Sequence, residues 1–226
     1  MSDNTIYITS PNEFLRPYIE QETGKTEPAF SVMVSSTYIY SPDRDAIINE
    51  DGPIDKNSPW AQYENEFLKA HPDGIILRAA PIVGTGMTGK IRRLAEEIYK
   101  ARFFHFPENE ARKSVVHACD VAKVVAFLSK NGVPEGGRRI FNICDGEDPT
   151  LHDIAEALAY RMENKRISTL STRPQQMIGR ILYGKRYNDY ICNERFNGQA
   201  LRDITGIKPV PVCEYLRTHV YDENSL

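Results

Sequence analysis

The chain has 226 residues, of which 41% are hydrophobic, so it can build a buried core in one large domain or two small ones. Its 28 Lys and Arg residues against 31 Asp and Glu residues give a formal net charge of -3. This balance excludes the basic surplus typical of general nucleic-acid binding or of attachment to an anionic membrane.

The sequence also lacks the usual marks of export and of metal binding. No apolar run approaches the roughly 18 residues of a membrane span, and the N-terminal residues MSDNTIYITS show no signal pattern. We therefore expect a cytoplasmic protein with no membrane partner. The four cysteines stand singly, without the spacing of a zinc site or of a disulfide framework, so no metal site is predicted.

Short β-rich runs alternate with helical patterns along the chain, which indicates an α/β fold. Ile75 to Val83 is almost wholly apolar, as expected of a strand buried on both faces of a parallel sheet. Two helix starts carry capping residues, namely Asp120 and the pair Thr150 and Asp153. In chain order, the predicted elements are strand Asn4 to Thr9, helix Ser10 to Glu22, strand Phe30 to Val34, a long loop Ser41 to Pro59, helix Trp60 to Ala70, strand Ile75 to Val83, helix Ile91 to Ala101, the short run Phe103 to Phe106, helix Asp120 to Ser129, strand Arg139 to Cys144 and helix Leu151 to Met162.

A glycine-rich loop from Gly84 to Lys90 satisfies two motifs at once. It reads as GxGxxG after a strand, with Glu108 further on, which is the pattern of a dinucleotide-binding turn. It also reads as GxxxxGK, the phosphate-binding loop of nucleoside triphosphatases, but Ile91 stands where that motif needs a Ser or Thr for Mg²⁺. A sharp turn required by packing alone is the third interpretation.

Four segments in register resemble the second half of an extended short-chain dehydrogenase/reductase, the NAD-dependent epimerase/dehydratase family that works on nucleotide sugars. Val34 to Ser41 (VSSTYIYS) resembles the family's serine strand, and Ile76 to Gly86 (ILRAAPIVGTG) resembles its "lRp..vyGpg" strand and loop. Lys113 to Val125 (KSVVHACDVAKVV) resembles "RdfvhVdDvA", and Arg138 to Leu158 is similar to the "yNi.dg...t..el" segment. The likeness covers roughly residues 30 to 160.

The resemblance implies a truncated Rossmann-like parallel sheet with a small, mostly helical C-terminal substrate lobe. The opening strand, followed by Ser-Pro-Asn, looks like the family's fourth strand, so the first three strands and the adenosine site are expected to be missing. The other interpretation is a degenerate first strand, with Thr9 and Ser10 where glycines should be. We expect one interlaced unit over residues 1–226, in which 1–83 with 112–145 form the sheet layer and 84–111 with 146–226 form the substrate lobe.

The resemblance also locates the catalytic positions. Ser36 matches the family's catalytic serine, with Thr37 as a substitute. Where the family writes SPYxxSK, this chain writes SPWAQYE, so Trp60 holds the tyrosine position and Glu64 holds the lysine position. Indole has no titratable proton and a carboxylate opposes a phenolate, so the family's acid–base route cannot run through these two positions.

The sequence offers two alternative sets of catalytic residues. Tyr63 could be a displaced tyrosine, but Lys69 follows six residues later and therefore falls on another face of the helix. His117 and Asp120 could join Ser36 in a hydrolase triad, yet in the family this segment has a structural role. We favour neither of these two sets as the catalytic residues.

The substrate half of the family's site is better preserved than the cofactor half. The resemblance places Gly84 and Gly86 on the substrate side, and it places Lys113 and Arg186 at two positions that contact the nucleotide-sugar diphosphate. A solvated surface cation is the other interpretation of both. Pro81 occupies a cofactor-side position.

Other polar and aromatic residues have less specific interpretations. We expect Arg78, on an otherwise apolar strand, to brace the sheet through buried hydrogen bonds rather than to touch a ligand. Tyr183, Tyr187 and Tyr190 stand among basic residues and fit the lip of the substrate lobe or a subunit contact.

The expected function is that of an epimerase/dehydratase-like protein that binds or acts on a nucleotide sugar, with NAD or NADP as cofactor if it uses one. The alternative is a non-catalytic binding or scaffold protein that retains the fold. A third possibility is an active enzyme whose cofactor is held partly by another subunit. Since the missing strands would expose a sheet edge, we expect a homo-oligomer or a complementing chain to cover it.

Overall fold

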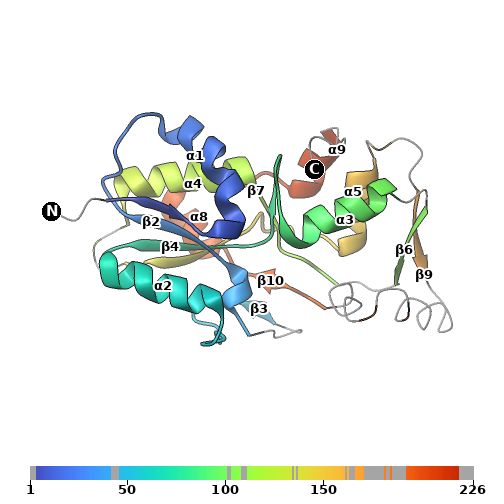
Figure 1. Ribbon diagram of the computed structural model, residues 1–226, viewed down its shortest axis with the longest axis horizontal. Helices are drawn as coiled ribbons and strands as arrows, with labels where there is room; N and C mark the ends of the chain where they lie inside the picture. The colour runs from blue at the N-terminus through green and yellow to red at the C-terminus, as the bar shows by residue number, and fades with distance from the viewer. Residues whose placement is uncertain are drawn as a thin grey trace.

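A computed structural model describes residues 4–41, 46–100, 103–107, 111–133, 135, 137–160, 162, 166–170, 181, 184 and 192–218 of the chain. Its centre is a four-stranded parallel sheet in the order β1-β2-β4-β8 (Figure 1). The strands are β1 (Ile6–Ile8), β2 (Val32–Ser36), β4 (Ile75–Ala79) and β8 (Ile140–Ile143). The fold is therefore α/β with a Rossmann-like parallel sheet, as the sequence predicted.

Helices cover both faces of this sheet. Helices α1 (Arg16–Thr23) and α4 (Ala118–Asn131) lie on one face, and α2 (Pro59–Ala70) lies on the other (Figure 1). Because helices cover both faces, every residue of β2 and β4 is buried, including the polar Ser35, Ser36 and Arg78.

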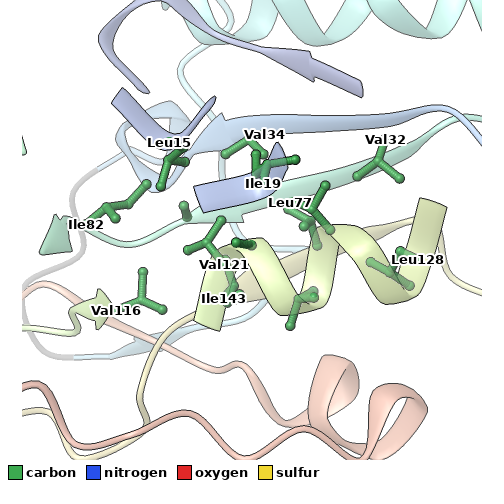
Figure 2. Close-up of a cluster of buried hydrophobic side chains, with 14 of the residues drawn as sticks. Leu15, Ile19, Val32, Val34, Leu77, Ile82, Val116, Val121, Leu128 and Ile143 are labelled. Carbon is green, nitrogen blue, oxygen red and sulfur yellow. The ribbon is translucent and has the colours of Figure 1, made fainter. Parts of the chain in front are cut away.

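The larger part of the core lies between the sheet and the α1–α4 layer. Figure 2 shows this cluster, in which Val32, Val34 and Leu77 from the strands meet Ile19 from α1 and Val121 from α4. A smaller cluster on the opposite face joins Met33 and Ile76 to Phe67 of α2. The alternating side chains of the strands therefore pack against helices on both faces of the sheet.

Beyond the sheet, a second group of elements packs on its own core, with α3 (Gly89–Lys100), α5 (Leu151–Ala159) and α9 (Val212–Thr218) around a shared apolar cluster. It lies at the right of Figure 1, where β6 (Phe103–Pro107) pairs with β9 (Arg166–Leu170). The remaining elements are the 3₁₀ turns η1 (Ser10–Leu15) and η2 (Thr37–Ile39), the paired short strands β3 (Ile47–Ile48) with β10 (Arg195–Phe196) and β5 (Ile82–Val83) with β7 (Val116–His117), and helix α8 (Gln199–Thr205).

The boundaries of most predicted elements hold within a few residues, and the capping box at Thr150 and Asp153 is confirmed by both reciprocal bonds. The expected single strand Ile75 to Val83 is wrong. It ends at Ala79, the Ala80 amide bonds to the carbonyl of Ile143, and Pro81 has no amide hydrogen to continue the ladder. The chain then resumes as β5 beside β7.

Two smaller expectations also need correction. Asp120 is not the cap of its helix, because α4 begins two residues earlier and His117 caps it by accepting a bond from the Cys119 amide. The predicted loop from Ser41 to Pro59 contains the short strand β3. Within the described part of the chain, no helix combines the length and apolarity needed to cross a membrane.

Candidate functional site

The serine position lies at the carboxyl end of β2, the edge where ligands bind in open parallel sheets. Ser36 is buried, and its hydroxyl oxygen accepts a hydrogen bond of 3.2 Å from the amide of Tyr38, which starts the turn η2. Thr37 donates to the carbonyl of Ala79 on β4, at 3.2 Å. Both hydroxyl groups therefore hold the local backbone in place.

Glu64, which the sequence resemblance compares with the family's lysine, forms a buried ion pair with Arg78. Arg78 donates from Nε to Oε1 at 3.0 Å and from Nη2 to Oε2 at 2.8 Å, and Ser35 donates to Oε1 at 2.7 Å. The two charged side chains are only 5% and 6% exposed. This confirms the expectation that Arg78 braces the sheet, and it explains the acid on α2: the carboxylate neutralises an arginine of the central strand β4.

The brace extends to Tyr40. Its hydroxyl accepts from Nη1 of Arg78 at 3.1 Å and donates to Oδ1 of Asn142 on β8 at 2.7 Å. Burial raises the pKa of Tyr40, and the neighbouring Arg78 charge opposes that rise without cancelling it. The buried hydroxyl thus links Arg78 on β4 to Asn142 on β8. We call Ser35, Tyr40, Glu64, Arg78 and Asn142 the arginine brace.

Trp60, which the sequence resemblance compares with the family's tyrosine, makes apolar contacts. Its half-buried ring packs against the apolar cluster of Ile39 and Tyr40, and it meets the ring of Tyr63 edge-on at 6.1 Å between centroids. Lys69 lies in the last turn of α2.

The glycine loop packs against the N-terminal helical segment. A Cβ at Gly84 would lie 2.8 Å from Cβ of Ala118 and 3.1 Å from the hydroxyl of Tyr18, so no side chain fits there. Thr88 donates to the carbonyl of Pro11 at 2.8 Å. These contacts favour the packing interpretation of Gly84. Gly86, by contrast, adopts a φ of 80°, a conformation that favours glycine for backbone reasons.

Lys113 has an unusual environment for a lysine, because its side chain is only 5% exposed. Its ammonium donates to the carbonyl of Cys192 at 2.6 Å and lies 3.6 Å from Oε2 of Glu194. The other carboxylate oxygen of Glu194 accepts from Lys90 at 2.7 Å, and the Lys90 ammonium lies 5.2 Å from the ring centroid of Tyr38. We call Lys90, Lys113 and Glu194 the lysine cluster.

The electrostatics of the lysine cluster are only partly balanced. Burial lowers the pKa of Lys113, and the Glu194 carboxylate offsets this effect while the charge of Lys90 adds to it. Two ammonium groups share one carboxylate within the described residues, and the more deeply buried ammonium has the longer contact. Such a group can gain from an additional anion.

Lys90 and Glu194 were not among the residues predicted for a site. Lys90 was visible as the last residue of the GxxxxGK pattern, although the motif itself does not apply. Glu194 gave no signal, because it lies 104 residues from Lys90 in the sequence. Only the fold brings these charges together.

The remaining predicted positions divide into three groups. Pro81, expected near a cofactor, is half-buried between β4 and β5, and its carbonyl accepts from the amide of Val116 at 3.1 Å. His117 caps α4, and Asp120 accepts bonds from Lys123 and from the amide of Val210, so both have structural roles. Four residues fall outside the described part of the chain, namely Arg186, Tyr183, Tyr187 and Tyr190. The described residues include no group of three or more acidic, Cys or His residues able to hold a metal ion.

Comparison with known proteins gives the fold a context. No family model matches the sequence, and a search of curated proteins returned no match. Solved structures do match. The human epimerase family protein SDR39U1, solved with NADPH, superposes with a TM-score of 0.60 at 14% identity, over 93% of this chain and 74% of that one.

Two further structures bear on nucleotide sugars. TunA, an NAD-dependent NDP-hexosamine 5,6-dehydratase, matches with a TM-score of 0.59 at 16% identity, over 96% of this chain and 75% of that one. A UDP-N-acetylglucosamine 4-epimerase from Methanobrevibacter ruminantium M1, solved with UDP-N-acetylmuramic acid, matches with a TM-score of 0.56 at 17% identity, over 83% of this chain and 60% of that one. The chain thus has a Rossmann-like α/β fold resembling that of NAD-dependent epimerases and dehydratases.

Proposed function

We propose that this protein binds a nucleotide sugar and that Lys113 holds the diphosphate. The observation that carries the proposal is the burial of Lys113, whose ammonium has one short hydrogen bond and only a longer contact to a shared carboxylate. A buried ammonium is costly unless it is well paired, so its retention favours a ligand that completes the pairing. In this proposal Arg186 supplies the second cation, and Gly84 and Gly86 lie on the substrate side.

The proposal includes no proton transfer through the family's tyrosine and lysine positions. Trp60 has no titratable proton, and Glu64 is held by Arg78 and Ser35. Of the family's catalytic residues, only the serine has a matching residue here, namely Ser36. Its hydroxyl oxygen accepts a hydrogen bond from the amide of Tyr38. If the protein is an enzyme, it uses NAD or NADP through a different arrangement, with Pro81 on the cofactor side.

A calorimetric titration tests this proposal. Wild-type protein and the Lys113→Met variant are titrated with UDP-, GDP- and dTDP-sugars, and separately with NADH and NADPH. We expect one class of nucleotide sugar to bind wild type at least tenfold more tightly than the variant. Arg93→Met is the control for loss of a positive charge, because Arg93 is an exposed residue of α3, three positions after Lys90, and is outside the lysine cluster. If no nucleotide sugar binds at millimolar concentration, the proposal fails.

The second candidate is a non-catalytic scaffold, and the arginine brace favours it over an active reductase. A scaffold needs the fold but no cofactor, and the brace uses the lysine position for stability. Absence of both cofactor binding and nucleotide-sugar binding, together with a normal unfolding transition, would support this candidate.

The sheet edge carries the partner proposal. Strand β1 pairs with β2 on one side, and Tyr7 on β1 is 44% exposed beside Phe67 of α2, with 6.4 Å between the ring centroids. An edge strand beside an exposed aromatic side chain favours pairing with another chain. We propose a homo-oligomer or a complementing chain at this edge. A monomer at micromolar concentration by light scattering would contradict self-association.

The organisation of the chain remains a proposal as well. We propose one interlaced unit, with 1–83 and 112–145 in the sheet layer and 84–111 and 146–226 in the substrate lobe. Phe14 supports it, since this ring packs against the apolar clusters of both parts. Limited proteolysis should then release no stable fragment that corresponds to the sheet layer or to the substrate lobe alone. A cytoplasmic location is kept as a proposal, and cell fractionation tests it.

A further inference from the structure

We infer that the Glu194 carboxylate is an internal counter-anion that a ligand phosphate displaces from Lys90 and Lys113. The inference rests on the proposed function and deepens it, because it names a regulating residue in the same site. It begins from the geometry of the shared carboxylate, whose oxygens lie 2.7 Å from the Lys90 ammonium and 3.6 Å from the Lys113 ammonium.

The position of Glu194 in the chain allows its side chain to move while its backbone stays fixed. Its amide donates to the carbonyl of Arg112 at 2.9 Å, and its carbonyl accepts from the amide of Ser114 at 2.7 Å. These two bonds anchor the residue beside Lys113, immediately before β10. The side chain itself is 24% exposed, so its carboxylate can turn toward water without disturbing the sheet.

The two lysines differ in how they can respond. Lys113 is 5% exposed and is held at its ammonium by the Cys192 carbonyl, so it stays in place. Lys90 is 28% exposed, stands in the first turn of α3 and lies over the ring of Tyr38, so its ammonium is the more accessible of the two and marks the solvent side of the cluster. A phosphate arriving from that side meets Lys90 first and then competes with Glu194 for Lys113.

Charge decides what can replace the carboxylate. A ligand carboxylate carries the same single negative charge as the Glu194 carboxylate, so replacing one with the other would gain nothing in charge. A phosphate or diphosphate brings more negative charge and more acceptor oxygens to the same two ammonium groups. The chemical class that fits is therefore a phosphoanhydride or phosphate ester, and Glu194 sets a threshold that weaker anions do not pass.

The test is a titration with inorganic pyrophosphate, which carries the proposed anion without a nucleoside or sugar. Glu194→Gln keeps the shape of the side chain and removes its charge, so we expect it to bind pyrophosphate about tenfold more tightly than wild type. Lys90→Met should bind it more weakly than wild type. Glu96→Gln, which removes an equally charged partner of Arg92 elsewhere on α3, is the matched control and should leave the affinity unchanged.

Thermal unfolding supplies a second readout. Without ligand, Glu194→Gln should melt below wild type, because two ammonium groups lose their shared anion. Pyrophosphate should raise its melting temperature by more than it raises that of wild type. Equal affinity of Glu194→Gln and wild type, or no binding by either, overturns the inference.

These outcomes are separable from those of the proposed function. If wild type binds nucleotide sugars but Glu194→Gln binds pyrophosphate no better, the inference fails and the proposed function stands. If the variant gains pyrophosphate affinity but neither protein binds a nucleotide sugar, the anion site stands and the proposed function fails.

Discussion

The arginine brace and the lysine cluster both place charged groups inside the fold, and they differ in how completely those charges are matched. In the brace, the Arg78 guanidinium meets Glu64 through two short bonds, and every other member of the brace adds a hydrogen bond. In the lysine cluster, one carboxylate of the described residues contacts both ammonium groups, and its distance to the Lys113 ammonium is 3.6 Å.

The two regions also differ in the direction of their pKa shifts. Burial alone would lower the pKa of Arg78, but the bonds to Glu64 outweigh it and raise the pKa. For Lys113 the burial effect wins and the pKa falls. The comparison indicates that a well-matched buried charge stabilises the fold, whereas the incompletely matched Lys113 is the charge at which we propose that an anion binds.

Glu64→Lys should have the largest effect. This change would restore the lysine of the family's Tyr and Lys pair. In this fold, however, it places a second positive charge beside the buried Arg78, which repels it. We expect a loss greater than the roughly 3–5 kcal/mol for removing one partner of a buried pair, and hence little soluble protein. Glu66→Lys, an exposed site on the same helix, is the control with the same charge change. Near-normal folding of Glu64→Lys, measured by expression and urea unfolding, would contradict the brace.

Arg78→Met should be the next largest. It leaves the Glu64 carboxylate buried with Ser35 alone, and we expect the free energy of unfolding to fall by about 3–5 kcal/mol. The double variant Glu64→Leu with Arg78→Met removes both charges and should recover a large part of the loss. Urea unfolding of the single and double variants measures the coupling. Additive losses would show that the two groups do not act as a pair.

Asp145→Asn should have an intermediate effect that appears in the pH dependence. Burial raises the pKa of Asp145 from 3.8 to about 6, although its carboxylate accepts bonds from the amides of Val212 and Glu147. Since the folded state holds this proton more tightly, the stabilisation is complete below about pH 4 and is lost as the pH rises through about 6. Wild-type stability should therefore decline by on the order of 1–3 kcal/mol across this window.

The Asn variant should lack this decline, as measured by urea unfolding at several pH values. Asp73→Asn, at a carboxylate that is 90% exposed, should keep it. The same slope in wild type and in Asp145→Asn would show that Asp145 is not the group that titrates.

The sequence could predict the elements whose signals are local. The Thr150 and Asp153 pair lies within one helical turn, and α5 begins at Leu151 as expected. Helix α2 begins at Pro59, one residue before the predicted start at Trp60. The N-cap of α4 was misassigned because Asp is a preferred cap residue and His is not. In the fold, Asp120 accepts a bond from the amide of Val210, and His117 caps the helix.

The candidate site was less predictable because its contacts are long-range. Arg78 on an apolar strand and Glu64 in place of a lysine were each visible as exceptions. Their pairing across 14 residues depends on α2 crossing the sheet, which no local pattern specifies. Lys113 was proposed through its family position, and its role as a binding residue stays a prediction. The carboxylate beside it comes from Glu194, which is distant in the sequence and is brought to Lys113 by a backbone bridge.

Lys113→Met should change stability least, and it is the sharpest test of the comparison because Arg78→Met makes the same kind of substitution. The Met side chain removes an incompletely paired buried charge, and Glu194 keeps Lys90 as its partner. We therefore expect the free energy of unfolding near neutral pH to rise or to stay within about 1 kcal/mol of the wild-type value. Because the pKa of Lys113 is lowered in the folded state, the unfolded chain binds its proton more tightly, and wild-type stability should increase as the pH rises toward the ordinary lysine pKa. The Met variant should lack that increase and should bind nucleotide sugars at least tenfold more weakly. A loss of stability as large as that of Arg78→Met would mean that the lysine cluster is a second structural brace, and the distinction between the two regions would fall.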